Sequence, residues 1–304
     1  MKMRWSKLGL IYRPDGTLPW AQSYAFMPTA RVLGDVVRVF FASLDENKFG
    51  RVGFVDLDRR NLRNVLRTAV EPLIDLGEAG TFDDSGVSPS CVVDVNGRTF
   101  LYYVGWQRCE KVPYMLYTGL ATSVDGLTFK RASRTPVLDR TSNEPFLRSG
   151  PTIVATDGVL KMWYNSAVRW TKVNGAAYPM YIIRYAESVN GFDWKAREER
   201  CIDFKDESEF GFGRPWVVRD HDAYRMWYSI RSRTSPYRIG YAESFDGLKW
   251  IRKDDQAGIE ASSTGWDSEM ICYPCVVDID GQRYMFYNGN RHGSTGFGHA
   301  VLES

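Results

Sequence analysis

The sequence predicts an all-β fold, a five-bladed β-propeller with four antiparallel strands in each blade. Two observations support this prediction: a proline recurs at a nearly fixed interval, and the same order of β-rich and turn segments follows each one. The prolines are 61, 62, 64 and 59 residues apart in a chain of 304 residues, at Pro28, Pro89, Pro151, Pro215 and Pro274. Self-similarity at a fixed period indicates a repeat architecture, and five units of four strands lie within the usual range of propellers.

The first strand of each unit is expected directly after its proline. Short β-rich runs stand at 29–33, 90–95, 152–155, 216–219 and 275–279. A turn follows each run, commonly with Gly or Asp, as in Asn96-Gly97 and Asp280-Gly281. Such pairs between β-rich runs are hairpin signals, so each unit begins with a hairpin.

The second strand of each unit is aromatic. It is expected at 39–41, 101–103, 162–164, 226–228 and 285–287. An aromatic residue stands 13 positions after the proline at Phe41, Tyr164, Tyr228 and Tyr287. A third strand is expected after a variable loop, at 51–57, 119–121, 184–187, 239–243 and 298–301.

A stereotyped turn leads from the third strand to the fourth. It has the sequence Ser-x-Asp-Gly or Ser-x-Asn-Gly and begins at Ser123, Ser188 and Ser244. Asp-Gly and Asn-Gly supply the positive φ angles of a tight hairpin, so these residues are structural. An aromatic residue of the fourth strand follows at Phe129, Trp194 and Trp250.

The fifth unit ends after its third strand, and the start of the chain can supply the missing one. Trp5 lies 23 residues before Pro28, and Trp250 lies 24 residues before Pro274. We therefore expect residues 4–12 to pair with the last strands, which closes the propeller and removes an exposed sheet edge. The whole chain, 1–304, is then expected to be a single domain.

Composition narrows the partners of the chain. Thirty-nine basic and thirty-seven acidic residues give a formal net charge of +2, with no run of like charge to follow a phosphate backbone. Nucleic acid is therefore not expected, and neither is a membrane, because no 18-residue apolar segment or signal peptide is present. Five scattered cysteines fit free thiols in a cytoplasmic protein. No metal or other cofactor is expected, since the three histidines are far apart and Cys272 and Cys275 lack a second pair.

Acidic residues precede four of the five prolines. In a propeller these segments meet at one mouth of the central channel, and a concave mouth is the default ligand site. Cleavage of a glycosidic bond needs paired carboxylates, one as acid and the other as base or nucleophile. Asp84, Glu209 and Glu269 are the candidate acid–base residues, with Asp83 and Asp267 beside them as candidate substrate ligands. Each of them could instead cap a turn or a strand.

Further side chains near the same mouth could bind a substrate. Arginine forks suit phosphate or carboxylate groups, although each arginine could instead pair with a neighbouring acid. Aromatic rings could stack on a sugar face, and asparagines could bond its hydroxyl groups. These candidates are Trp106, Arg148, Arg214, Arg231, Tyr273, Asn288 and Asn290.

The units Tyr241–Trp250 and Tyr185–Trp194, with the aromatic second strands and the proline-anchored first strands, resemble the five-bladed propeller glycosidases. These are the superfamily of glycoside hydrolase families 43, 32 and 68, with the related family 130. The motifs at 82–89 and 267–274 most resemble intracellular propellers of that superfamily, described as glycosylase or family 32-like. The resemblance implies a propeller fold and a carbohydrate or glycoconjugate substrate.

The chain departs from the superfamily at the positions that would carry catalysis. In the arabinanase and invertase groups, catalytic acids directly precede the proline in blades one and three. Here the residues directly before the prolines are Met27, Ser88, Gly150, Arg214 and Tyr273. Three hypotheses follow: an enzyme that cleaves or transfers a glycosyl unit by carboxylate chemistry, a non-catalytic sugar-binding propeller, and a phosphorylase or glycosyltransferase that uses an arginine-bound phosphate.

Overall fold

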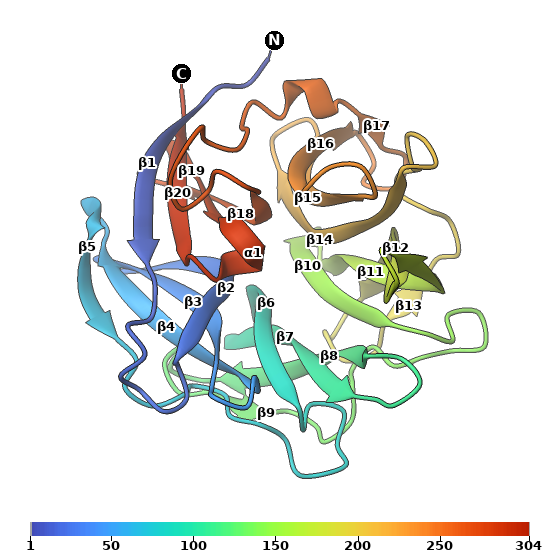
Figure 1. Ribbon diagram of the computed structural model, residues 1–304, viewed down its shortest axis with the longest axis horizontal. Coiled ribbons are helices and arrows are strands. Elements are labelled where there is room, and N and C mark those ends of the chain that lie inside the picture. Colours follow the sequence, from blue (N-terminus) through green and yellow to red (C-terminus); the bar gives the residue numbers. More distant parts are fainter. Residues whose placement is uncertain (1, 304) are drawn as a thin grey trace.

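The computed structural model describes residues 2–303, and its strands surround a central axis (Figure 1). The strands pair in antiparallel sets of four. The first set is β2 (Ser23–Leu33), β3 (Val36–Leu44), β4 (Gly50–Asp58) and β5 (Asn61–Thr68). The second is β6 (Gly86–Val95), β7 (Arg98–Arg108), β8 (Tyr114–Ser123) and β9 (Lys130–Arg131). The third is β10 (Arg148–Thr156), β11 (Val159–Val173), β12 (Ala176–Ser188) and β13 (Lys195–Ala196).

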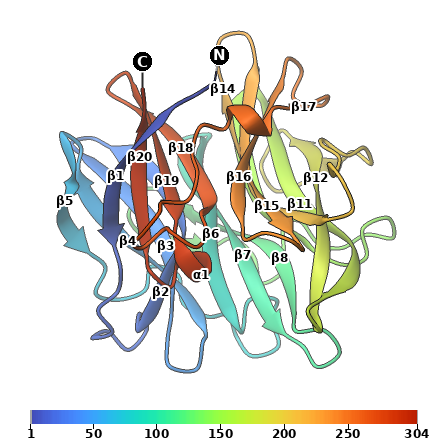
Figure 2. The same cartoon turned by 45° about the horizontal axis from the view of Figure 1, so that its top comes forward.

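The remaining two sets bring the two ends of the chain together. The fourth set is β14 (Glu209–Arg219), β15 (Tyr224–Ser232), β16 (Arg238–Ser244) and β17 (Ile251–Arg252), followed by the 3-10 turn η1 (Asp254–Gln256). The last set is β18 (Cys272–Ile279), β19 (Gln282–Asn288), β20 (Phe297–Leu302) and β1 (Trp5–Tyr12), with the short α1 (Asn290–Gly293) after β19. The start of the chain thus pairs with its end, and Figure 2 shows β1 alongside β20. Within residues 2–303 no helix has the length and apolar character needed to cross a membrane.

The inner strands are β2, β6, β10, β14 and β18, which surround the axis in Figure 1. They begin two to six residues before their prolines rather than after them, and a β-bulge lies at or beside every proline. Proline has no N–H to donate to a ladder, so a bulge is a place where a strand can hold it. The residue before the proline has a positive φ at Met27, Gly150, Arg214 and Tyr273. These kinks turn the residues that precede the prolines toward the axis.

The aromatic second strands form the core between the sets. Phe41, Tyr102, Tyr164, Tyr228 and Tyr287, each 13 positions after its proline, are all fully buried. Packing of this kind accounts for the aromatic offset in the sequence, because each strand is covered on both faces by neighbouring sets.

Aromatic residues at the start of the fourth strand, or directly before it, join the second to fifth sets each to the set before it. They pack edge-on against second-strand aromatics at centroid distances of 5.9, 6.0, 6.0 and 6.1 Å, in the pairs Phe40–Phe129, Tyr102–Trp194, Trp163–Trp250 and Trp5–Trp227. Trp5 therefore occupies in the last set the place that Trp250 occupies in the fourth. All five cysteines are free thiols, and four of them are buried.

Candidate functional site

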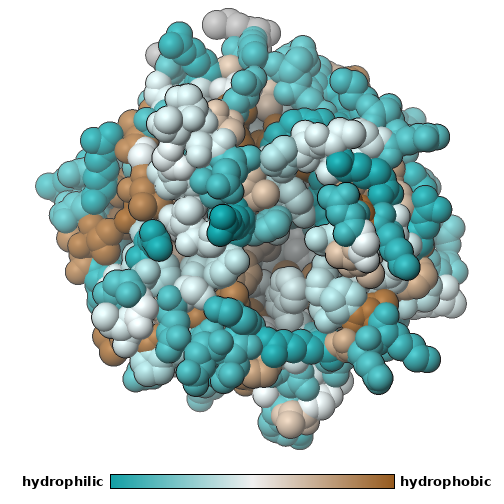
Figure 3. All heavy atoms as spheres, viewed as in Figure 1, coloured by the Kyte–Doolittle hydropathy of each residue, from teal (hydrophilic) through white to brown (hydrophobic). Residues whose placement is uncertain are grey.

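A cavity of about 440 Å³ lies where the inner strands converge. Its volume is within the range of small-molecule sites. Figure 3 shows one face of the molecule hollowed near its middle. The five residues that directly precede the prolines, Met27, Ser88, Gly150, Arg214 and Tyr273, all line this central cavity. The bulged strands thus bring together residues that are about 60 positions apart in the sequence, as the proline period indicates.

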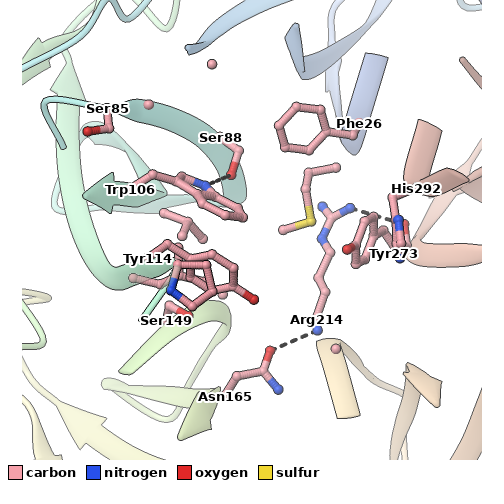
Figure 4. Close-up of a pocket in the computed structure, with 18 of the residues that line it drawn as sticks. Phe26, Ser85, Ser88, Trp106, Tyr114, Ser149, Asn165, Arg214, Tyr273 and His292 are labelled. Atoms are coloured by element: carbon pink, nitrogen blue, oxygen red, sulfur yellow. Dashed lines mark hydrogen bonds between the residues drawn. The ribbon is translucent and has the colours of Figure 1, made fainter. Parts of the chain in front are cut away.

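Aromatic side chains form two walls of the central cavity. Trp106 of β7 and Tyr114 of β8 lie on one side, with ring centroids 5.0 Å apart. Tyr273 of β18 and His292 of α1 lie on the other, 6.1 Å apart (Figure 4). Burial lowers the pKa of His292 to about 4, so its imidazole is neutral at pH 7. The cavity can therefore hold a flat apolar surface such as one face of a sugar ring.

Arg214 lies between these walls and ties the inner strands together (Figure 4). Its Nη1 donates to the carbonyl oxygens of Pro28 and Tyr273, at 2.7 and 3.2 Å. Its Nη2 donates to Thr29 Oγ1 and to the carbonyl oxygen of Ser90, at 2.6 and 3.3 Å. Burial lowers the pKa of Arg214 to about 10, which leaves it charged at neutral pH. Both terminal nitrogens are used within the fold, so Arg214 holds the axis rather than offering a fork to a ligand.

Arg231 of β15 has a different environment. It is 4% exposed and lies against the rings of Tyr181, Phe210 and Tyr237, at 5.1, 4.7 and 5.9 Å from their centroids. Its Nη1 donates to the carbonyl oxygen of Pro179 at 3.1 Å. Within residues 2–303, neither its Nε nor the buried hydroxyl group of Tyr181 has a hydrogen-bond partner.

The three candidate acid–base residues do not line the central cavity. Asp84 accepts hydrogen bonds from the Gly80 amide at 2.9 Å and from Ser85 Oγ at 2.7 Å, as a turn cap does. Glu209 is buried and pairs with Arg252 at 2.8 Å. Glu269 is exposed, with Arg291 at 3.9 Å. No Asp or Glu is present in the cavity lining formed by the described residues, so the structure does not bring these carboxylates together there.

Asp83 and Asp267 are buried, and each joins two strands of its set, a role different from the substrate binding expected of them. Asp83 Oδ2 accepts from Tyr103 at 2.9 Å and from Arg131 of β9 at 2.8 Å. Asp267 Oδ2 accepts from Tyr287 at 2.9 Å and from Lys7 of β1 at 2.7 Å. In both sets the acid ahead of the inner strand connects the second strand to the fourth. A buried carboxylate needs such partners, which explains the acids before the prolines without catalysis.

The other expected polar ligands are also occupied within the fold. Arg148 pairs with the buried Glu144 at 3.1 Å. Asn288 accepts from the Met27 amide at 2.8 Å and donates to the carbonyl oxygen of Ala25 at 2.6 Å. Asn290 accepts from the Glu269 amide at 2.7 Å. Arg148, Asn288 and Asn290 lie outside the cavity lining, whereas Trp106, Arg214, Arg231 and Tyr273 belong to it.

Several lining residues were missed from the sequence. Tyr114, Tyr178, Tyr181, Tyr237 and His292 come from loops, or the strand ends beside them, that follow the second strand of a set. The proximity of those loops to the channel mouth was the available signal, because it applies to every aromatic residue in them. Among residues 2–303, no three His, Cys, Asp or Glu side chains are placed to hold a metal ion.

The chain has a β-propeller fold that is similar to those of solved glycoside hydrolases. A solved protein described as "Glycoside hydrolase" superposes with a TM-score of 0.76 at 18% identity, covering 99% of this chain and 91% of that one. A glycosyl hydrolase from Bacteroides ovatus gives 0.76 at 13% identity, with 99% and 94% covered. The Bombyx mori GH32 beta-fructofuranosidase BmSUC1 gives 0.61 at 13% identity, with 99% and 61% covered. These similarities confirm the propeller fold.

The chain belongs to the same family as two Mycobacterium tuberculosis proteins. These are described as "Uncharacterized protein Rv1502" and "Uncharacterized protein MT1551". Each is 39% identical to this chain over 303 residues, which covers 99% of this chain and 100% of the relative. No protein-family model matches the chain.

Proposed function

We propose that the protein is a single five-bladed propeller domain whose central cavity binds a carbohydrate. The five antiparallel sets are its blades, and β1 is the outer strand of the last one. The cytoplasmic location expected from the sequence stays a prediction.

The observation that supports sugar binding is the pair of aromatic walls across the cavity. Trp106 and Tyr114 face Tyr273 across a space of about 440 Å³, which accommodates a small sugar. Aromatic faces with a few convergent polar groups are typical of small-molecule sites. The superfamily fold raises the expectation of a carbohydrate ligand, although fold alone does not assign a function.

The cavity favours sugar binding without hydrolysis by paired carboxylates. Two-carboxylate hydrolysis requires both groups beside the glycosidic bond, about 5 to 9.5 Å apart. Among the described residues, 2–303, the cavity lining contains no acid, and Asp84, Glu209 and Glu269 are engaged or exposed elsewhere. Cleavage or transfer by those three residues therefore remains a prediction with little geometric support.

Ligand titration tests the proposed site. We expect some member of a panel of mono- and disaccharides and their aryl glycosides to bind the wild type. The Trp106→Ala variant should bind that ligand at least about 10-fold more weakly, because it loses the stacking surface. Phe245→Ala is the matched control, since Phe245 is 82% exposed in the turn after β16 and lies outside the cavity. Equal affinity of Trp106→Ala and wild type would place the ligand elsewhere.

Turnover separates the binding and catalytic readings. Activated aryl glycosides should not be hydrolysed faster by the wild type than by Asp84→Asn or Glu269→Gln. A loss of hydrolysis by about 100-fold or more in either variant would restore the carboxylate mechanism and overturn the binding-only reading.

A further inference from the structure

Arg231 is a buried arginine without an anionic partner. Among residues 2–303, other deeply buried arginines have more partners: Arg38 forms a two-point pair with Asp56 at 2.7 and 3.0 Å, Arg148 pairs with Glu144 at 3.1 Å, and the terminal nitrogens of Arg214 donate to four oxygen acceptors. Arg231 has one acceptor, the carbonyl oxygen of Pro179. A buried charge normally has a counter-charge or a full set of hydrogen bonds. Arg231 has neither.

The aromatic rings around Arg231 offset only part of the free-energy cost of burying its charge. Tyr178, Tyr181, Phe210 and Tyr237 place their rings within 6 Å of the guanidinium carbon. Ring faces attract a cation, but they do not accept the directed N–H bonds of a guanidinium. Within residues 2–303 the Nε of Arg231 and the hydroxyl group of Tyr181 are both buried without a hydrogen-bond partner, and both residues line the central cavity. Among the same residues the Nε of Arg148 and of Arg214 lacks a hydrogen-bond partner as well, so Arg231 differs from them in having a single acceptor and no carboxylate beside it.

The charged side chains in the described lining of the central cavity are all basic. Lys48 and Arg108 line its mouth and are exposed, Arg214 lies at its centre, and the part of the lining that the structure describes contains no acid. A site with several cations and no carboxylate attracts anions and repels cations. The guanidinium fork matches the geometry of a carboxylate or a phosphate.

We propose that the ligand of the central cavity is an anionic sugar whose carboxylate or phosphate group binds Arg231 and the Tyr181 hydroxyl group. This inference depends on the proposed carbohydrate function and adds the class of ligand. The sugar ring lies between the aromatic walls, and the anion completes the hydrogen bonds of the two side chains. A neutral sugar leaves both donors unsatisfied and binds more weakly.

Calorimetric titration of matched ligands tests the proposal. Each neutral sugar is compared with its uronic acid, its sugar 1-phosphate and its sugar 6-phosphate, and inorganic phosphate is titrated alone. The wild type should bind one anionic form about 10- to 100-fold more tightly than the neutral parent, as charge-assisted hydrogen bonds do. The uronic acid and phosphate arms identify which anion is preferred.

Substitutions in the cavity wall test which side chains cause the preference for the anionic ligand. Arg231→Met should lose this preference, measured as the ratio of anionic to neutral affinity within the same variant, and Arg231→Lys should retain part of it. Arg233→Met is the matched control, because Arg233 is exposed two residues further along and donates to Thr171 and to the carbonyl oxygen of Lys172. Tyr181→Phe keeps the ring and removes only the hydroxyl group, so it tests the site even if Arg231→Met fails to fold. Its ratio of anionic to neutral affinity should fall as well.

The outcomes separate the two proposals. Equal binding of neutral and anionic sugars by the wild type would overturn this inference and leave carbohydrate binding intact. The same preference in wild type, Arg231→Met and Tyr181→Phe would also overturn it. Binding of inorganic phosphate that depends on Arg231, with no sugar bound in any form, would support the anion site and overturn the carbohydrate function.

Discussion

Replacing Trp5 by alanine should destabilise the whole protein, because this residue anchors the strand that completes the last blade. Trp5 is 6% exposed and packs edge-on against Trp227 of the fourth set, with centroids 6.1 Å apart. Its Nε1 donates to the carbonyl oxygen of Ala257 at 3.1 Å. One side chain from β1 therefore connects the last set to the set before it.

The expected loss of folding stability follows from the burial of Trp5. Truncation of a buried tryptophan costs about 3 to 5 kcal/mol, and the orphaned Ala257 carbonyl places Trp5→Ala near the middle, about 4 kcal/mol. For 304 residues the entropy of unfolding is about 0.64 kcal/mol/K, so the melting temperature should fall by roughly 6 °C. Trp5→Phe retains most of the packing and should lose about 1 to 2 kcal/mol.

Thermal unfolding by circular dichroism measures this effect, and Leu10→Ala is the control. Leu10 lies on the same strand but is 43% exposed, so its truncation should cost less than about 1 kcal/mol. A melting temperature of Trp5→Ala equal to that of Leu10→Ala would refute the reasoning, because β1 would then not be needed to close the fold.

Two further predictions concern buried charges. Burial holds the pKa of His292 and of His299 at about 4, below the 6.5 of an unfolded chain. Each histidine therefore makes folding stability depend on pH. Up to about 3 kcal/mol of stability for each is present above pH 6.5 and is lost as the pH falls through 4. His299→Gln should therefore lose less stability than the wild type between pH 7 and pH 4 in urea titrations, and equal losses would contradict this. Arg148→Met should lose about 3 kcal/mol because it weakens the compensation of buried Glu144, whereas Arg231→Met, which abandons no carboxylate, should lose less than about 1 kcal/mol. Equal losses in these two variants would show that Arg231 has a counter-charge in the free protein.

Much of the fold could be predicted from the sequence because the repeat is expressed in residue types that act locally. A proline interrupts a ladder wherever it stands, and Asp-Gly or Asn-Gly makes a tight turn without help from distant residues. The position of Trp5 relative to Pro28 predicted the pairing of β1 because it copied that of Trp250 relative to Pro274. The starts of the inner strands were predicted too late, since the bulges at the prolines allow pairing to continue on both sides.

The site was harder to predict because the fate of a carboxylate depends on a partner elsewhere in the chain. Asp83 meets Arg131, and Asp267 meets Lys7 from the opposite end of the sequence. No local sequence pattern distinguishes a carboxylate that joins two strands from a catalytic acid. The five residues before the prolines were correctly expected near the mouth, because the repeat fixes the backbone there. Arg214 and Arg231 looked equivalent in the sequence, and only their hydrogen bonds separate them: Arg214 donates from both terminal nitrogens to the inner strands, whereas Arg231 has a single acceptor.

A crystal structure of the protein with its tightest sugar ligand tests the central claim most directly. The account predicts that the sugar ring lies between Trp106 and Tyr273 in the central cavity. It also predicts that an anionic group of the ligand lies within hydrogen-bond distance of Arg231 and the Tyr181 hydroxyl group. A sugar bound beside Asp84, Glu209 or Glu269, with the central cavity holding none, would contradict it.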